Sequence, residues 1–151
     1  MSFESMLSAL NISASGMSAE RLRMEVVANN VANAFSTRTP AGGPFRRQDV
    51  VFATIINDQV RAPRTSGRAP ASSLLGGVRV DGIVDDISPF QVVYNPGHPD
   101  ADAFGYLLLP NVQLPIEMVN LITANRAYEA NLKVLQSYRQ EAEQALLLVR
   151  V

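Results

Sequence analysis

Apolar residues recur at spacings of three and four near both ends of the chain, a pattern typical of helices with one apolar face. The N-terminal apolar series consists of Phe3, Leu7, Leu10, Ala14, Met17, Met24, Ala28 and Val31, interrupted by Arg21. The C-terminal apolar series consists of Met118, Leu121, Tyr128, Leu132, Leu135, Ala142, Leu146 and Val149, interrupted by Asn125 and Arg139. Because each series extends over about four heptads, as in coiled coils, we predict two long helices that need partner helices.

The middle of the chain lacks this helical period. Short strand-like runs are separated there by glycine, proline and polar residues. We predict strands at 49–56, 90–94 and 106–109, two short strand-like runs at 78–80 and 83–84, and a long mobile loop at 61–77. The predicted fold class is α+β: residues 1–35 and 115–151 form a discontinuous, coiled-coil-like helical domain. Residues 36–114 form a small antiparallel β-rich region of three to five strands.

Polar residues mark the inner ends of both helices. Asn29, Asn30 and Asn33 are poor helix formers, so the end of the first helix is either frayed or held by contacts from outside it. Pro115 suits the first position of the second helix, and Glu117 in its first turn is favoured by the helix dipole. We therefore include the three asparagines among the predicted interface residues.

Charge is distributed unevenly although the formal net charge is only −1. Residues 38–79 hold seven arginines and two aspartates, whereas residues 81–102 hold five aspartates and no Lys or Arg. An acidic block repels phosphate, so we expect no nucleic-acid partner. The two blocks either join subunits head to tail or are the solvated surface of one domain. The residues assigned to such contacts are Arg46, Arg47, Asp85 and Asp86.

Polar residues on the helices also have two interpretations each. Arg21 and Arg126 either pair with Glu117 or Glu129 of an adjacent subunit, or form weak exposed pairs within one chain. Asn125 either fixes the register of packed helices or lies at the wet edge of a bundle.

The chain carries no recognisable catalytic or metal-binding pattern. It has no cysteine, and its single histidine, His98, lies in a turn-forming Pro-Gly-His-Pro run. The aspartates lack calcium-ligand spacing, and Gly76-Gly77 lacks the context of a phosphate loop. No apolar run is long enough to span a membrane, and the N-terminal residues do not read as a secretory signal. We predict neither enzyme activity nor a cofactor.

Several segments resemble one known family. Residues 15–34, which contain Asn29-Asn30-Val31-Ala32-Asn33, are similar to the N-terminal signature of bacterial flagellar rod, hook and hook-associated proteins, and the likeness continues through 43–52. The chain resembles proximal-rod members in particular at 77–80, 84–86, 88–89, 93–102, 105–106, 110–112, 117–119 and 124–131. These segments lie in order over most of the chain, which makes the resemblance specific.

The resemblance implies a structural role. Members stack helically, with copies of themselves and other rod proteins, into a hollow drive shaft that crosses the periplasm and conducts exported proteins. Their terminal helices form its inner wall, and surrounding ring proteins or peptidoglycan are further expected contacts. They are exported by the flagellar type III system without a cleaved signal. The alternatives are a distal rod or hook subunit, or a soluble coiled-coil adaptor.

Overall fold

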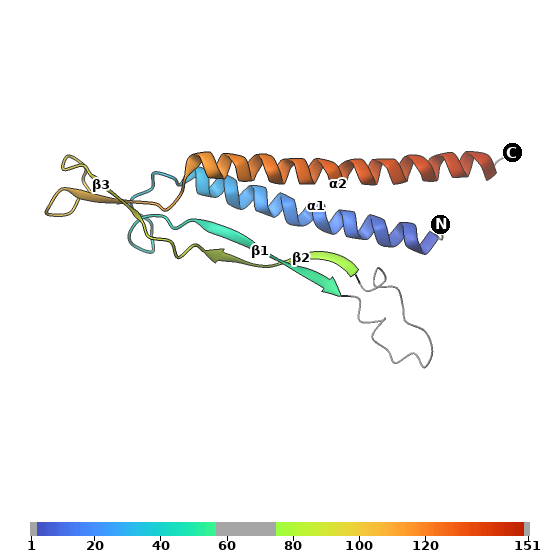
Figure 1. Cartoon of the computed structure of the whole chain (residues 1–151), viewed down its shortest axis with the longest axis horizontal. Coiled ribbons are helices and arrows are strands. Elements are labelled where there is room, and N and C mark those ends of the chain that lie inside the picture. The colour runs from blue at the N-terminus through green and yellow to red at the C-terminus, as the bar shows by residue number, and fades with distance from the viewer. Residues whose placement is uncertain (1–2, 57–74, 150–151) are drawn as a thin grey trace, which may run out of the picture. The chain divides into compact units, whose positions relative to one another are not determined.

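A computed structural model of the chain describes residues 3–56 and 75–149 (Figure 1). The order of its elements is α1 (Phe3–Ala32), β1 (Gln48–Ile56), β2 (Leu75–Asp85), β3 (Gln91–Tyr94), β4 (Tyr106–Leu109) and α2 (Leu114–Val149). The predicted α+β class is therefore confirmed: along the chain, a long helix precedes and a long helix follows a middle region of short strands.

Both helices begin and end close to the predicted residues. In α2, Pro115 lies in the first turn, where its missing N–H costs no hydrogen bond, and Glu117 is the acidic residue of that turn. At the other inner end, α1 stops at Ala32, and Asn33 closes it through bonds to the backbone oxygen and side chain of Asn29, both at 3.0 Å. The asparagine-rich end is therefore held in place by hydrogen bonds.

The strands form two separate two-stranded sheets, β1–β2 and β3–β4, in the part of the chain that the structure describes. In the second sheet the strands are antiparallel, and Val92 lies opposite Leu108 while Tyr94 lies opposite Tyr106. The two runs predicted within 78–84 belong to one strand, β2. Most of the predicted loop at 61–77 lies outside the described residues.

The structure divides into two compact units, and each combines helix with strand. Unit 1 contains residues 1–21, 52–81 and 125–151. In it α1 contacts α2 and β2: a Cβ added at Gly16 would lie 3.1 Å from Asn131 Nδ2 of α2, and the N–H of Val78 in β2 donates to Ser15 Oγ at 3.1 Å. The absence of a side chain at Gly16 thus lets the two helices approach closely.

Unit 2 contains residues 22–51 and 82–124, and most of the buried core lies in it. The buried apolar residues of this unit are Val26, Val27, Ala34, Leu107, Val112 and Ala124. Buried polar residues, Asn30, Asn111 and Glu117, lie in the same unit. Each compact unit contains both helix and strand, so these units do not test the predicted division into a helical domain and a β-rich region, which stays a prediction.

Candidate functional site

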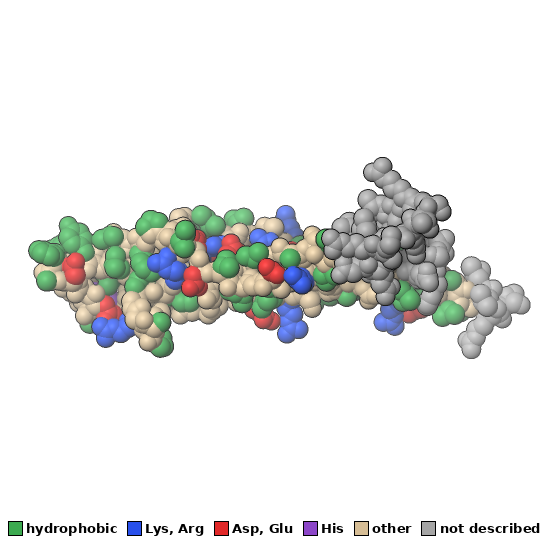
Figure 2. Space-filling model, turned by 90° about the horizontal axis from the view of Figure 1, so that it is seen from below, with side chains coloured by type: hydrophobic (Ala, Val, Ile, Leu, Met, Phe, Trp, Pro, Cys, Tyr) green, Lys and Arg blue, Asp and Glu red, His purple; other side chains and the backbone are tan. Residues whose placement is uncertain are grey.

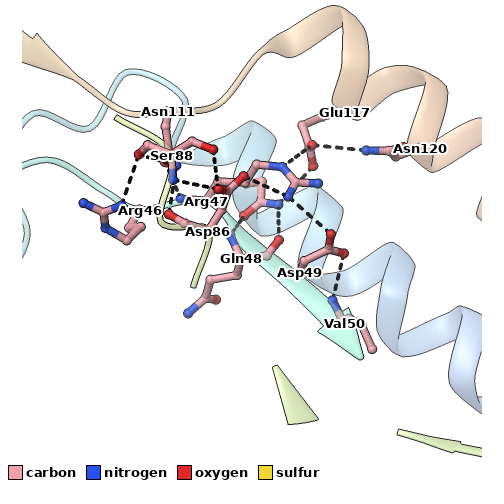
Figure 3. Close-up of polar contacts among 11 residues, drawn as sticks. Arg46, Arg47, Gln48, Asp49, Val50, Asp86, Ser88, Asn111, Glu117 and Asn120 are labelled. Atoms are coloured by element: carbon pink, nitrogen blue, oxygen red, sulfur yellow. Dashed lines mark hydrogen bonds and ion pairs between the residues drawn. The ribbon is translucent and has the colours of Figure 1, made fainter. Parts of the chain in front are cut away.

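A cluster of polar side chains lies at the centre of unit 2, where the inner ends of α1 and α2 meet the start of β1 (Figure 3). Glu117 is its central residue and is fully buried. Its Oε1 accepts a hydrogen bond from Arg47 Nε at 2.9 Å, and its Oε2 accepts one from Asn30 Nδ2 at 3.0 Å. Asn120, one turn along α2, donates to the same carboxylate at 3.2 Å. The buried charge is thus both paired and hydrogen-bonded, as a buried carboxylate requires.

Asn30 connects this carboxylate to β1. Its Nδ2 donates to the carbonyl oxygen of Gln48 at 2.8 Å, and its Oδ1 accepts the N–H of Gln48 at 2.9 Å. The side-chain amide therefore satisfies both backbone groups of the first residue of β1. A helix, a strand and a second helix are joined by two side chains that are almost completely buried.

A second set of bonds in the cluster holds the turn at Asp86–Ser88 (Figure 3). Asn111 accepts the N–H of Arg47 at 2.8 Å and donates to the carbonyl oxygens of Asp86 and Ser88 at 3.1 and 3.3 Å. Arg46 donates to the same two oxygens at 2.8 and 3.2 Å, and its guanidinium stacks on Phe90 at 4.3 Å. The turn is therefore fixed from two sides.

The electrostatics of the cluster follow from these contacts. Burial of Arg47 acts to lower its pKa, but the hydrogen bond and charge of Glu117 and the charge of Asp49 outweigh burial, so the pKa is raised. Hydrogen bonds from the hydroxyl and the N–H of Ser88 lower the pKa of Asp86, and Arg47 adds to this effect. Both groups stay charged at neutral pH, which suits a structural ion-pair network.

Residues of the two apolar series fall into a half-buried set and an exposed set. The half-buried residues are Leu10, Met17, Met24, Val31, Tyr128, Leu132, Leu135 and Ala142, and the exposed ones are Leu7, Ala14, Ala28, Met118, Leu121 and Leu146. The side chains of Phe3 and Val149 lie outside the described residues. In unit 1 a cavity of about 230 Å³ lies between α1 and α2, lined by Met17, Arg21, Tyr128 and Leu135 among others. The two helices of one chain therefore do not fill each other's apolar surface.

Several of the predicted polar interface residues have partners within the chain. Asn30, Arg46, Arg47 and Asp86 belong to the cluster described above, and Asp85 Oδ1 accepts from Gln48 Nε2 at 3.2 Å. Arg38 of the basic block pairs with Asp100 of the acidic block at 2.7 Å. Part of the charge complementarity between the two blocks is therefore used inside one molecule.

The remaining polar candidates lie on the helices. Asn29 and Arg126 are exposed, and Asn125, also exposed, donates to Glu129 one turn further along α2 at 2.9 Å. Glu117 is buried against Arg47, so in this conformation it is not available to an arginine of another subunit. The role of the others in subunit contacts, including Arg21 and Asn33, stays a prediction.

Sequence reasoning missed several residues that the structure brings together. Asn111 and Gln48 give no periodic signal, because their partners are distant in sequence: Asn111 lies 64 residues from Arg47. Gly77, with φ of +113°, places its backbone against Ser15, and any side chain there would collide with that hydroxyl. The available signal was the Gly-Gly pair, which the sequence placed at the end of the predicted loop; glycine inside a strand, where the structure puts this pair, often marks a close backbone approach.

The structure offers no metal-binding group of three His, Asp or Glu side chains among the residues it describes. The Nδ1 atom of His98 accepts the N–H of Asp100 at 3.1 Å, which places the histidine in a turn. None of the described helices is both long and apolar enough to cross a membrane.

Comparison with known proteins shows similarity along nearly the whole chain. Two family profiles match: "Flagella basal body rod protein" over residues 10–38 and "Flagellar basal body rod FlgEFG protein C-terminal" over residues 104–148. The flagellar basal-body rod protein FlgC of Borreliella burgdorferi is 40% identical, over 96% of this chain and 98% of that protein. The FlgC proteins of Salmonella typhimurium and Bacillus subtilis are 38% and 37% identical, over 95% and 91% of this chain and 97% and 94% of theirs.

Proposed function

Since this chain belongs to the FlgC family of flagellar basal-body rod proteins, it is a structural subunit of the proximal rod, and we propose that its terminal helices make the contacts by which subunits assemble. Its location is accordingly the flagellar basal body. The alternatives of a distal rod or hook subunit and of a soluble adaptor lose their support, because the similar proteins described above are FlgC proteins.

The observation that carries this proposal is the apolar surface left on the outer side of α2. Met118, Val119 and Ile122 are exposed, although the buried residues Glu117 and Ala124 show that the opposite side of the same turns faces the interior. Three neighbouring apolar side chains on the solvent side of a helix are typical of a surface covered by another helix or subunit. In a rod, neighbouring subunits would supply that cover.

The same proposal extends to the assembled rod. Copies of this chain and other rod proteins stack helically around a common axis, transmit torque, and leave a central channel for exported proteins. The chain reaches this location through the flagellar type III system without a cleaved signal. Ring proteins and peptidoglycan around the rod are further partners. These points depend on the family resemblance, and the exposed apolar side chains support the packing part of them.

The proposal is tested with a charge placed on the outer side of α2. Ile122→Asp keeps an exposed position exposed, so we expect the chain to fold and be made in normal amounts but rod assembly and swimming to be lost. The matched control is Gln140→Asp. Gln140 is exposed and lies 18 residues after Ile122, which at 3.6 residues per turn places it on the same side of α2 as Ile122. The assays are swimming in soft agar and recovery of the chain in isolated basal bodies. Normal swimming by the Ile122→Asp strain would contradict the proposal.

A further inference from the structure

The β3–β4 hairpin carries apolar side chains on both of its faces. Residues opposite each other in an antiparallel pair point to the same face, so Val92, Leu108, Tyr94 and Tyr106 form one surface, the hairpin outer face. All four are between 48% and 65% exposed, whereas Leu107, on the other face, is buried. Figure 2 shows apolar side chains gathered over this hairpin. An antiparallel sheet with one covered face normally has polar residues on the other, so this face is unusual for a solvent surface.

The hairpin outer face is held in a fixed form. The rings of Tyr94 and Tyr106 meet edge to face with centroids 5.4 Å apart. The turn before β4 is fixed by Asp102, whose Oδ1 accepts the N–H groups of Phe104 and Tyr106 at 2.9 and 2.8 Å. A surface that is already ordered loses little conformational entropy when it binds a partner.

The edge of this face is acidic. A cavity of about 490 Å³ borders it, and its charged lining residues are the two acids Asp100 and Asp102 and one base, Arg38. Asp100 is paired with Arg38 at 2.7 Å. Asp102 is exposed, and in the described part of the chain no Lys or Arg forms an ion pair with it. A partner for this face would therefore be apolar with a positive charge at its edge.

The outer side of α2 has that composition. Met118, Val119 and Ile122 are exposed apolar residues, and Arg126 follows Ile122 by about one turn on the same side of the helix. Arg126 is also exposed. The chain thus displays two surfaces that match each other in apolar character and in charge.

We propose that the hairpin outer face of one copy packs on the outer side of α2 of the next copy, with Arg126 directed at Asp102. This inference rests on the assembly function proposed above. Because the two surfaces come from different parts of the chain, the contact is heterologous, and every added copy presents a new surface for the next. The apolar side chains supply the buried area, and the charge pair sets the orientation.

Cysteine cross-linking tests this contact directly, because the chain has no cysteine of its own. Basal bodies are isolated from cells that carry Val92→Cys and Ile122→Cys in one chain, oxidised mildly, and run on a non-reducing gel. We expect a ladder of dimers, trimers and longer species that a reductant collapses to monomer. Either single variant should give monomer only.

The control strain combines Val92→Cys with Gln140→Cys. Residue 140 lies about 27 Å beyond Ile122 along α2, at 1.5 Å per residue. We expect its cross-linked yield to be at least about tenfold lower, because a disulfide needs Cα atoms within about 7 Å. Asp102→Asn removes the charge but keeps the Oδ1 acceptor, and should slow cross-linking by about two- to fivefold, the range of an exposed ion pair. If the first pair of substitutions keeps the chain out of the basal body, a second pair, Leu108→Cys with Val119→Cys, tests the same contact.

Swimming before oxidation tests the assembly function, and the ladder tests the contact, so the two can fail separately. Absence of a ladder from both pairs in strains that swim would overturn the inference. Dimers from a single variant, which indicate a symmetric contact, or cross-links to a different rod protein would also overturn it.

Discussion

Replacing Glu117 by alanine should strongly destabilise the chain, because Glu117 is the buried centre of the polar cluster. The substitution removes the acceptor of three donors, the Nε of Arg47 and the side-chain amides of Asn30 and Asn120. The Glu117 side chain is only 1% exposed and that of Arg47 16%, so water cannot replace the lost bonds without opening the cluster. The Arg47 charge is then left partly uncompensated.

The size of this loss of stability depends on which contacts Arg47 and Asn30 keep after Glu117 is removed. Removing one member of a buried ion pair costs about 3–5 kcal/mol. Arg47 keeps weaker contacts with Asp49 and Asp86, both at 3.4 Å, and Asn30 keeps its bonds to Gln48. We therefore expect a loss near the low end, about 3 kcal/mol of unfolding free energy. Glu117→Gln keeps the shape and one acceptor oxygen, and should cost about half of that.

The measurement is urea unfolding of the purified chain, followed by far-ultraviolet circular dichroism. The matched control is Glu129→Ala, which removes an exposed carboxylate of the same helix; among the residues that the structure describes, this carboxylate bonds only Asn125, one turn away. That change should cost at most about 0.5 kcal/mol. If Glu117→Ala and Glu129→Ala lowered the unfolding free energy equally, the cluster would not hold unit 2 together and the reasoning would be wrong.

Two further predictions concern stability. Gly77→Ala should cost about 1–3 kcal/mol in urea unfolding, because a side chain at φ of +113° is strained and collides with the Ser15 hydroxyl; an unchanged midpoint would refute the close approach. The pKa of Asp86 is lowered in the folded chain, so its stabilising effect is present above the unfolded pKa of about 3.9 and is lost as pH falls through the folded pKa. Between about pH 5 and pH 3 the natural chain should therefore lose more stability than Asp86→Asn, and parallel pH profiles of the two would contradict this assignment.

Local pattern predicted the elements well. The spacing of apolar residues placed both helices within a few residues of α1 and α2, and β-branched runs between glycines and prolines placed the strands. Such signals depend only on neighbours along the chain, so they need no knowledge of the fold. The number of sheets was less predictable: one β element was expected, and the described strands form two pairs.

The charge blocks show why a sequence pattern alone could not assign partners. Two interpretations of the blocks were open, and the structure pairs Arg38 with Asp100 and Arg47 with Asp86 in one molecule. Opposite charges more than 35 residues apart in sequence can meet within a chain or between chains, and composition is the same in both cases. Only the path of the backbone in unit 2 decides between them.

The sequence by itself determined the α+β class, the two long helices and the family, because these depend on periodicity and on ordered local motifs. The tertiary structure alone decided that Glu117 is buried, that Asn30 meets it across 87 residues of sequence, and that the hairpin outer face is left uncovered. The physical reason is that a polar or apolar side chain takes its role from its partners. Burial in three dimensions, which no local pattern encodes, determines whether those partners are water, the same chain or another subunit.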